Sequence, residues 1–450
     1  MNQTNLIKPV LDHEYPLITH GKGIYLYDEQ GKQYIDGSSG AVTASIGHGV
    51  QEIIDAMAEQ SKKVSFVYRS QFSTEAAEKL AKKISEISPG DLNWSFFVNS
   101  GSEATETAMK VAIQYWQEKG MKTKNKIISR WMSYHGITMG ALSMSGHITR
   151  RQLFEPMLEK YPSVSAPYYY RDAAHKTIEE CDDFYAQELE KAILRAGKDN
   201  VAAFIAEPMI GAAGGALIPS DQYFQKMKAV CDEYDVLFIA DEVMTGMGRT
   251  GKMFGMEHFN VIPDIMATGK GMSAGYTPMA ATIVSEKVME PILNGSKIIM
   301  SGHTFSANPQ SAATSLAVLN YIEKNNLVEN SARMGAYLKE KINELARTSE
   351  IIGDVRGKGL FVGIEFVKDK LTKKSFAREL DVVNKIVQLN FDEGLLVYPA
   401  NAGAEGLTGD AVILSPPLTI TKEEVDELVR RFAMALGKVE RELLGELSKS

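Results

Sequence analysis

Two carboxylates end an apolar run in the stretch IADEVMTGMGRTGKM, and a glycine-rich segment with a lysine follows them. Carboxylates bind metal ions or hold protons on basic nitrogens, and glycine-rich turns bind phosphates. Residues 246–252 match the G-x-x-x-x-G-K phosphate loop, but that loop needs a hydroxyl residue next, to hold magnesium, and Met253 follows instead. The match also starts five residues after Asp241 rather than directly after the strand. We therefore look for a partner of Asp241 other than ATP and magnesium.

A second chemical pattern is Ser100-Gly101-Ser102, which lies between the apolar run WSFFV and a helical pattern. One interpretation is a capped helix, because Ser-x-x-Glu is a capping box and Glu103 stands in the first turn. The other is an anion site, because the free amides and hydroxyls at a helix start bind phosphate. The segment by itself leaves both open.

Tyr134, Asp241 and Lys270 each fall just after an apolar run, and each has an ordinary interpretation beside a chemical one. Tyr134 in SYHG is a core residue or a stacking surface for a flat ligand, and His135 beside it fits a histidine satisfied in the core. Asp241 is a turn residue or the desolvated partner of a protonated ring nitrogen. Lys270 in TGKGMSAG is a surface charge or, between two glycines, an amine with a lowered pKa at a ligand.

Together these residues fit one ligand, a planar aldehyde with a phosphate and a basic ring nitrogen, which is pyridoxal phosphate. Lys270 would hold the aldehyde as a Schiff base, and Asp241 would keep the ring nitrogen protonated so that the ring accepts electrons. The amides of residues 100–102 would hold the phosphate. Thr304, in SGHTFSANP, lies at a turn that enters a helix and says little alone.

The elements that must position these residues are short apolar runs that alternate with amphipathic segments. Buried strands separated by helices indicate a mostly parallel sheet with helices on both faces, and ligands of such sheets gather at the carboxyl ends of the strands. The start predicts a hairpin with an Asp-Glu-Gln-Gly turn, and the end, from about residue 330, predicts a small α/β domain. We expect residues 1–65 and 326–450 to form this small domain and residues 66–325 to form a large ligand-binding domain, the two packed closely.

Composition sets further limits. A net charge of -8 and a pI near 5.7 argue against a nucleic-acid surface. Cys181 and Cys231 have no CxxC or histidine pairing, so we expect free thiols in a reducing compartment and no metal site. The chain shows neither a signal-peptide pattern nor an apolar run of membrane-spanning length. A cytoplasmic, soluble protein is expected.

The chain resembles the class III (subgroup II, ω-amino) aminotransferases of pyridoxal-phosphate fold type I. The resemblance covers nearly the whole chain and keeps the family's order. Its segments are GKGIYLYDEQGKQYIDGSSG, NSGSEATETAMK, YHG, EPMIGAAGG, DEVMTGMGRTGK, TGKGMSAG, GHTFSANP and SPPLTIT.

The resemblance implies a role for each matching residue. Lys270 is the Schiff-base lysine and the base that moves the proton, Asp241 is the partner of the ring nitrogen, and Tyr134 and Val243 lie on the two faces of the ring. The phosphate ligands are Ser100, Gly101 and Ser102, with Thr304 of the other subunit. Glu207 is a carboxylate near the substrate, and Arg249 is a structural arginine. A homodimer with shared active sites is implied.

Two departures from the family pattern concern specificity. Many members have Gln after DEV, near the cofactor's phenolic oxygen, whereas this chain has Met244. Many also have an arginine before PPL that pairs with the substrate carboxylate, and here Thr408 or Ile413 occupies that region. Because an arginine normally binds a carboxylate in a bidentate manner, another donor is needed. The candidates are Arg69, His303 and the pair Arg150-Arg151.

The implied activity is transfer of an amino group from an ω-amino acid or primary amine to a keto acid, in two half-reactions with a pyridoxamine intermediate. The alternative is a lyase, decarboxylase or aminomutase of the same family, which the missing arginine favours. A catalytically inactive binding protein is disfavoured because Lys270 and Asp241 are both present. The donor, the acceptor and the enantiopreference do not follow from the sequence.

Overall fold

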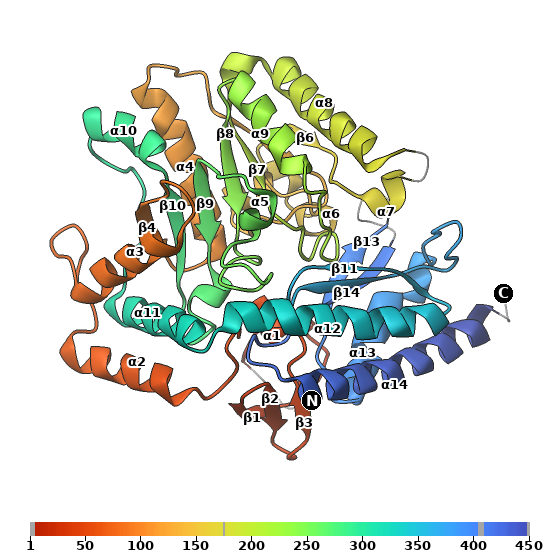
Figure 1. Cartoon of the computed structure of the whole chain (residues 1–450). Coiled ribbons are helices and arrows are strands. Elements are labelled where there is room, and N and C mark those ends of the chain that lie inside the picture. Colours follow the sequence, from red (N-terminus) through yellow and green to blue (C-terminus); the bar gives the residue numbers. More distant parts are fainter. Residues whose placement is uncertain (1–4, 174–175, 404–408, 448–450) are drawn as a thin grey trace.

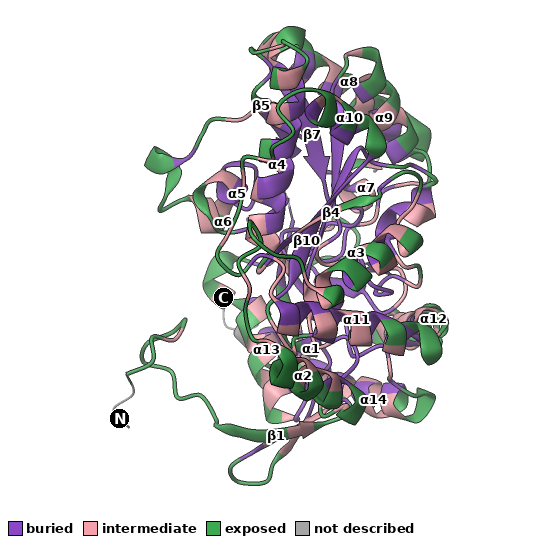
Figure 2. Cartoon of the chain, turned by 90° about the vertical axis from the view of Figure 1, so that its left-hand side faces the viewer, coloured by how far each residue is buried: buried purple, intermediate pink, exposed green. Residues whose placement is uncertain are grey.

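A computed structural model describes residues 5–173, 176–403 and 409–447 (Figure 1). Its centre is a seven-stranded sheet whose inner strands are completely buried (Figure 2). In spatial order the strands are β4 (Trp94–Val98), β10 (Ala280–Val284), β9 (Ile265–Thr268), β8 (Leu237–Asp241), β7 (Val201–Ala206), β5 (Lys126–Arg130) and β6 (Ser163–Val164). β10 pairs antiparallel with both of its neighbours, and the other pairs are parallel. The predicted mostly parallel sheet is confirmed.

The inner strands alternate between two cores, which explains why helices cover both faces. Ile205 and Ile239 face the core under α4 (Gly101–Glu118) and α10 (Glu286–Asn294). Phe204 and Phe238 face the opposite core, under α8 (Ile178–Ala196) and α9 (Tyr223–Glu233). Because successive side chains of a strand point to opposite faces, apolar residues at every position bury the sheet on both sides. The predicted helices on both faces are confirmed, and both cysteines lie buried and free in α8 and α9.

The amino-terminal part forms the predicted hairpin, extended by one strand. The strands β1 (Ile18–Lys22), β2 (Tyr25–Asp28) and β3 (Gln33–Ile35) pair antiparallel. Asp28 Oδ1 accepts hydrogen bonds from the Gln30 and Lys32 amides, both at 2.9 Å. A carboxylate that binds the turn amides in this way favours the reversal. The helices that follow are α1 (Ser39–Val42), α2 (Gln51–Lys63) and α3 (Glu75–Ile87).

The carboxyl-terminal part is a four-stranded antiparallel sheet covered by long helices. Its strand order is β11 (Ile352–Gly357), β12 (Val362–Phe366), β14 (Gly409–Leu414) and β13 (Tyr398–Ala402). Its helices are α12 (Leu327–Thr348), α13 (Val382–Asp392) and α14 (Lys422–Leu447), after α11 (Pro309–Lys324). The two chain ends meet here, because the Ile35 amide donates to Gly394 O at 2.8 Å and the Leu396 amide donates to Ile35 O at 2.9 Å. A small α/β part built from both ends is therefore confirmed.

Buried arginines join the small and large parts. Arg356 of β11 donates from Nε to Gly215 O and from Nη2 to Gly214 O, each at 2.8 Å. Arg249 donates from Nη1 to Leu360 O at 3.0 Å and to Pro416 O at 2.6 Å. These charge-assisted bonds tie the loop after β7 and the loop after β8 to the carboxyl-terminal sheet.

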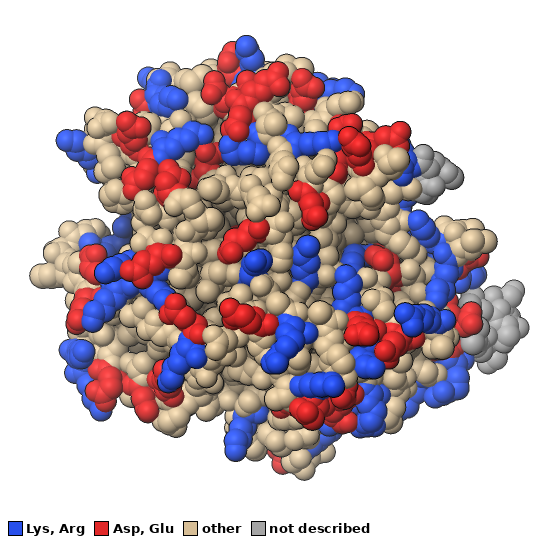
Figure 3. All heavy atoms as spheres, viewed as in Figure 1, with Lys and Arg blue, Asp and Glu red and all other residues tan. Residues whose placement is uncertain are grey.

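The surface is mixed in charge. Lys and Arg lie among Asp and Glu over the face shown in Figure 3, without a broad basic area on that face. Among the described helices, none combines the length and apolar character needed to cross a bilayer. The remaining helices are short or peripheral: α5 (Met139–Ser143), α6 (Ile148–Arg151) and α7 (Tyr169–Asp172).

Candidate active site

The candidate residues lie after the carboxyl ends of strands that run in the same direction through the large sheet. Asp241 is the last residue of β8, Glu207 follows β7, and Lys270 comes two residues after β9. Tyr134 follows β5 and Ser100 follows β4. Carboxyl ends of parallel strands share one edge of the sheet, so the strand order alone brings these residues toward one place.

Asp241 is buried and is held from two sides. Its Oδ2 lies 2.8 Å from His135 Nδ1, and its Oδ1 accepts the Val243 amide at 3.0 Å. Because a carboxylate oxygen accepts hydrogen bonds, we assign the donor role in this pair to His135 Nδ1. His135 Nε2 is buried and has no hydrogen-bond partner among the described residues. Each Asp241 oxygen keeps a lone pair for a further donor, as a protonated ring nitrogen requires.

Glu207 is a second buried carboxylate beside this pair. Its Oε2 accepts the Tyr134 amide and its Oε1 accepts the Gly211 amide, both at 3.4 Å. Burial raises the pKa of Glu207 to about 7, the positive potential of His135 opposes that rise, and Asp241 adds to it. The buried Arg130 donates to the Glu207 carbonyl at 2.6 Å and so fixes this part of the loop.

The Ser100-Gly101-Ser102 segment caps α4 and also contacts the other motifs. Ser100 Oγ accepts the Glu103 amide at 3.2 Å, so the helix is capped as expected. The Glu103 carboxylate accepts the Asn99 amide at 2.7 Å rather than that of Ser100, so the capping box is not closed. Ser102 Oγ accepts the Ile137 amide at 3.0 Å, which joins this segment to the one that carries Tyr134. A Cβ on Gly101 would lie 2.8 Å from Val243 Cγ1, so only glycine allows this approach.

Lys270 stands in a short turn with a left-handed backbone, at φ 44°, which is uncommon for a residue with a side chain. Its Nζ donates to Ala41 O at 2.7 Å. Burial lowers the pKa of Lys270 from 10.5 to about 8, although Asp241 nearby raises it. The position before it, Gly269, faces Val243 and Gly101, at 3.6 and 3.8 Å from a Cβ built there. The lysine turn therefore adjoins the helix start.

Thr304 lies apart from this group. It is exposed, and within the described ranges no hydrogen bond, ion pair or ring contact joins it to the other candidate residues. Its neighbour His303 has Nδ1 3.6 Å from Glu103 Oε1, so the loop lies beside the start of α4. The structure thus brings together all the predicted residues except Thr304.

The two departures from the family pattern also have definite positions. Met244 is half-buried and packs on the loop after Glu207, because a Cβ on Gly211 would overlap its Sδ. Ile413 is a buried residue of β14, and Thr408 lies outside the described residues. Arg249 is buried among backbone carbonyls, and burial lowers its pKa to about 9.

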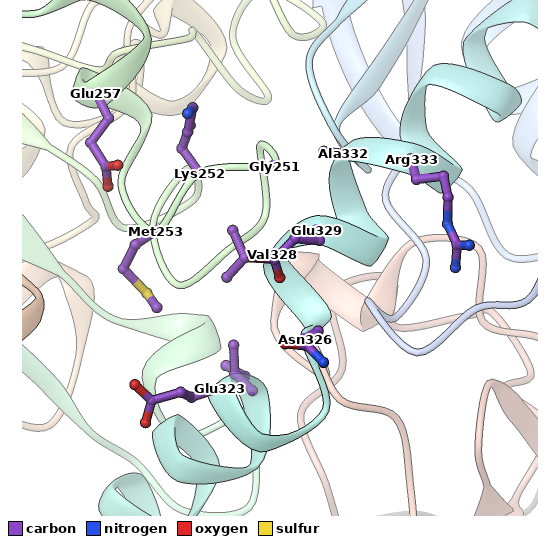
Figure 4. A pocket seen from close by; sticks show the side chains of 11 residues that line it. Gly251, Lys252, Met253, Glu257, Glu323, Asn326, Val328, Glu329, Ala332 and Arg333 are labelled. Carbon is purple, nitrogen blue, oxygen red and sulfur yellow. The ribbon is translucent and has the colours of Figure 1, made fainter.

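A groove elsewhere is lined by the last two residues of the segment that resembles a phosphate loop, Gly251 and Lys252. It has a volume of about 790 Å³, and Figure 4 shows it from close by. Its lining comes from residues 251–257 and from the junction of α11 and α12, not from the strand ends. Acidic and basic side chains alternate around it, including Lys252, Glu257, Glu329 and Arg333. This mixture does not make a phosphate site.

Nearly the whole chain matches the model of one enzyme family. Residues 9–436 match the model of the family described as "Aminotransferase class-III". The chain belongs to the class III aminotransferases. These enzymes depend on pyridoxal phosphate. The identification confirms the enzyme class that the motif order indicates.

Relatives and solved structures agree with this class III assignment. An uncharacterised aminotransferase of Bacillus subtilis, YodT, is 52% identical over 97% of this chain and 98% of its own. The putrescine–pyruvate aminotransferase of Pseudomonas aeruginosa is 34% identical over 92% and 88%. The ω-transaminase of Pseudomonas jessenii, solved in complex with PMP, is 36% identical and superposes with a TM-score of 0.90 over 95% and 93%. The fold is that of the class III transaminases.

The residues present fit a phosphorylated pyridine aldehyde. A capped helix start offers amides, a buried carboxylate keeps free lone pairs, and a lysine with a lowered pKa adjoins both. Sequence reasoning missed the partnership of His135 with Asp241, although the YHG motif already marked that histidine. It also left Arg150 as one candidate among several.

Proposed function

We propose that this class III aminotransferase holds pyridoxal phosphate at the carboxyl edge of its large sheet. The amides and hydroxyls of Ser100, Gly101 and Ser102 bind the phosphate, and Asp241 binds the ring nitrogen. Lys270 bonds to the aldehyde. Tyr134 and Val243 lie on the two faces of the ring, and Glu207 lies on the substrate side.

One observation carries this proposal: the start of α4, Val243 and the turn before Lys270 meet within contact distance. A Cβ added to Gly101 or to Gly269 would lie 2.8 or 3.6 Å from Val243 Cγ1. The phosphate-binding amides, the apolar contact of the ring and the reactive amine are therefore close enough to serve one small ligand. Such proximity of groups from three separate strands is typical of a cofactor site.

When bound, pyridoxal phosphate supplies an aldehyde that captures amines and a ring that withdraws electrons. The chain supplies the rest. Asp241, oriented by His135, holds a proton on the ring nitrogen. Lys270, with a pKa of about 8, is a base near neutral pH, and its Nζ takes a proton from the substrate carbon and returns it. Lys270 therefore both anchors the cofactor and moves the proton.

We propose that the amine donor is an ω-amino acid or a simple primary amine and that the acceptor is a keto acid. Support comes from the relatives, one of which is a putrescine–pyruvate aminotransferase and another an ω-transaminase. Half-buried Met244 beside Gly211 offers an apolar wall rather than a hydrogen-bonding one. Such a wall suits the methylene chain of an ω-amine.

We further propose a homodimer in which Thr304 reaches the cofactor phosphate of the other subunit. In support, Thr304 is exposed, and apolar side chains in nearby segments of the chain are exposed too. Phe305 is 59% exposed, Met300 77% and Phe72 64%. Clustered exposed apolar residues are typical of an association surface.

Two inferences from the sequence remain proposals. We place the protein in the cytoplasm, supported by its two free, buried thiols. We also keep the domain boundaries near residues 65 and 325, supported by the separate sheets on either side of them.

The test is chemical labelling of the cofactor lysine. Borohydride reduction of the purified protein, followed by peptide mapping, should place a phosphopyridoxyl group on Lys270. Lys270→Ala should lose the label and turnover. Lys252→Ala, in the segment that resembles a phosphate loop, should keep both, because Lys252 lies in the separate groove.

A second measurement follows the visible absorbance of the bound cofactor on addition of amine donors alone. A transaminase should convert its cofactor to the amine form without any acceptor. Label on another lysine, or unchanged turnover in Lys270→Ala, would contradict the assignment. Release of product without conversion of the cofactor would indicate the lyase chemistry instead.

A further inference from the structure

Arg150 is the basic residue whose position the function above does not use. It belongs to α6, a helix of four residues that follows His147. Its guanidinium carbon lies 4.4 Å from the centre of the Tyr134 ring. Tyr134 adjoins Glu207 and precedes His135, so the guanidinium stands at the edge of the candidate active site.

The guanidinium of Arg150 has no acceptor among the residues that the structure describes. Within the described part of the chain, no ion pair or hydrogen bond joins its side chain to another group. Its neighbour Arg151 differs, because its Nη1 donates to the carbonyls of Leu142, Ser143 and Ser145 at 3.1, 3.1 and 2.7 Å. Arg151 fixes the loop, and Arg150 keeps all five donors available.

The other candidate donors are engaged elsewhere. Arg69 donates from Nη2 to Ser301 O at 2.7 Å and packs over Phe96. His303 faces Glu103 at 3.6 Å. Ile413, at one of the positions where many family members have an arginine, is a buried residue of β14. Of the candidates named from the sequence, Arg150 alone combines free donors with a position beside Tyr134.

The charge of Arg150 acts on the same space as Lys270. After burial, which is the main cause, Arg150 lowers the pKa of Lys270 and also that of His147, which falls to about 4. Because Arg150 has no anionic partner among the described residues, its positive charge attracts an anionic ligand. The ligand that suits free guanidinium donors is a carboxylate.

We propose that Arg150 binds the carboxylate of acidic substrates, both the keto acid acceptor and ω-amino acid donors. The planar fork of the guanidinium takes both carboxylate oxygens, and the Tyr134 ring supports it from one side. The assignment rests on the proposed function and names the group that replaces the arginine absent before PPL. Simple amines do not use it, so the same site accepts them without an ion pair.

The experiment compares Arg150→Met, Arg150→Lys and wild type in separate half-reactions. Donors are β-alanine, which has a carboxylate, and butylamine, which has none, and pyruvate is the acceptor. In Arg150→Met we expect the ratio of kcat/KM for β-alanine to that for butylamine to fall on the order of 10- to 100-fold, mainly through KM. Pyruvate should lose a similar factor, and Arg150→Lys should recover part of it.

Propionate binding, measured by calorimetry, provides a readout independent of turnover. Propionate should bind wild type and lose the same factor in Arg150→Met. Arg195→Met, a change at an exposed arginine on α8, is the matched control and should leave every constant unchanged.

The outcomes separate the possible failures. Equal losses of kcat/KM for β-alanine and butylamine would leave their ratio unchanged. That result would show that Arg150 only positions Tyr134, and it would overturn the proposal. If none of the amines tested converted the cofactor of wild type to its amine form, the proposed function would fail first. Propionate binding that Arg150→Met left unaltered would then also exclude the carboxylate role.

Discussion

Lys270 combines three features that rarely coincide in one side chain. Its backbone is left-handed, its side chain is half-buried near Asp241, and its hydrogen bond goes to the carbonyl of Ala41 in the amino-terminal part. An uncharged amine is the form that attacks an aldehyde, so lowering the pKa prepares the residue for its partner. The bond to Ala41 is one that the amine can give up when the aldehyde arrives.

The first prediction is a pH dependence of cofactor capture. Because burial depresses the pKa of Lys270 from 10.5 to about 8, the neutral amine becomes the main form as pH rises past 8. The rate at which the apoenzyme takes up pyridoxal phosphate should therefore rise up to about pH 8 and level off above it. Stopped-flow absorbance measures this rate. A rate that keeps rising toward pH 10 would show that the lysine is not desolvated.

At the scale of the element, the loop after β8 depends on the second carboxylate of the opening motif. Glu242 is completely buried, and its oxygens accept the amides of Gly255 and Met256, both at 2.8 Å, and the hydroxyl of Thr245. Burial raises the pKa of Glu242 to about 7 in spite of these donors. Glu242 thus folds the segment back on itself, while Asp241 faces the site.

We expect Glu242→Gln to destabilise the protein by about 1–3 kcal/mol, because the new amide directs N–H groups at existing donors. The measurement is thermal unfolding above pH 7, where Glu242 is ionised. Glu233→Gln, at an exposed position at the end of α9, serves as the control and should change little. Equal unfolding temperatures for wild type and Glu242→Gln would contradict the structural role.

The elements differ in how well the sequence predicts them. The buried parallel strands are clear, because each is a short apolar run between amphipathic helices. β11 was not predicted, since it contains Asp354 and Arg356 and a glycine near each end. Its charges are paired only in the fold, where Arg356 binds both Asp354 and Glu365 of the neighbouring strand β12. β10 was not predicted either, because the chain must reverse after the lysine turn, and no local pattern specifies an antiparallel neighbour.

For the active site too, the sequence predicts local motifs but not contacts between distant residues. Lys270, Asp241 and the start of α4 were predicted because each has a recognisable motif. The pairing of His135 with Asp241 joins residues 106 positions apart and depends on strand order. Sequence spacing does not reveal which of the two adjacent arginines is engaged. In the part of the fold that the structure describes, Arg151 binds backbone carbonyls, and Arg150 keeps its donors free.

For the whole molecule, the surface suggests that one chain does not make a complete site. Thr304 and its apolar neighbours are exposed on the chain, and the amino-terminal segment extends away from the body, with Ile7 88% exposed (Figure 2). Such surfaces become buried when subunits associate. The phosphate site would then take ligands from both subunits.

Mixed dimers test this arrangement. Thr304→Ala should weaken binding of pyridoxal phosphate about 10- to 100-fold, the cost of a hydrogen bond to a charged group. A dimer of one Thr304→Ala subunit and one Lys270→Ala subunit should contain one native site, because Lys270 and Thr304 then come from different chains. Cofactor retention by the purified mixed dimer measures this. If retention matches that of the Thr304→Ala homodimer, each chain serves its own cofactor.

The meeting of the two chain ends at Ile35 has a consequence for synthesis on the ribosome. The large sheet has all its strands once residue 284 has emerged, so it can form while the chain is still being made. The β3 residue Ile35 must wait for Gly394 and Leu396, about 360 residues later. The Ala41 carbonyl, which holds Lys270, lies only six residues beyond Ile35. Completion of the active site is therefore delayed until nearly the whole chain has been translated.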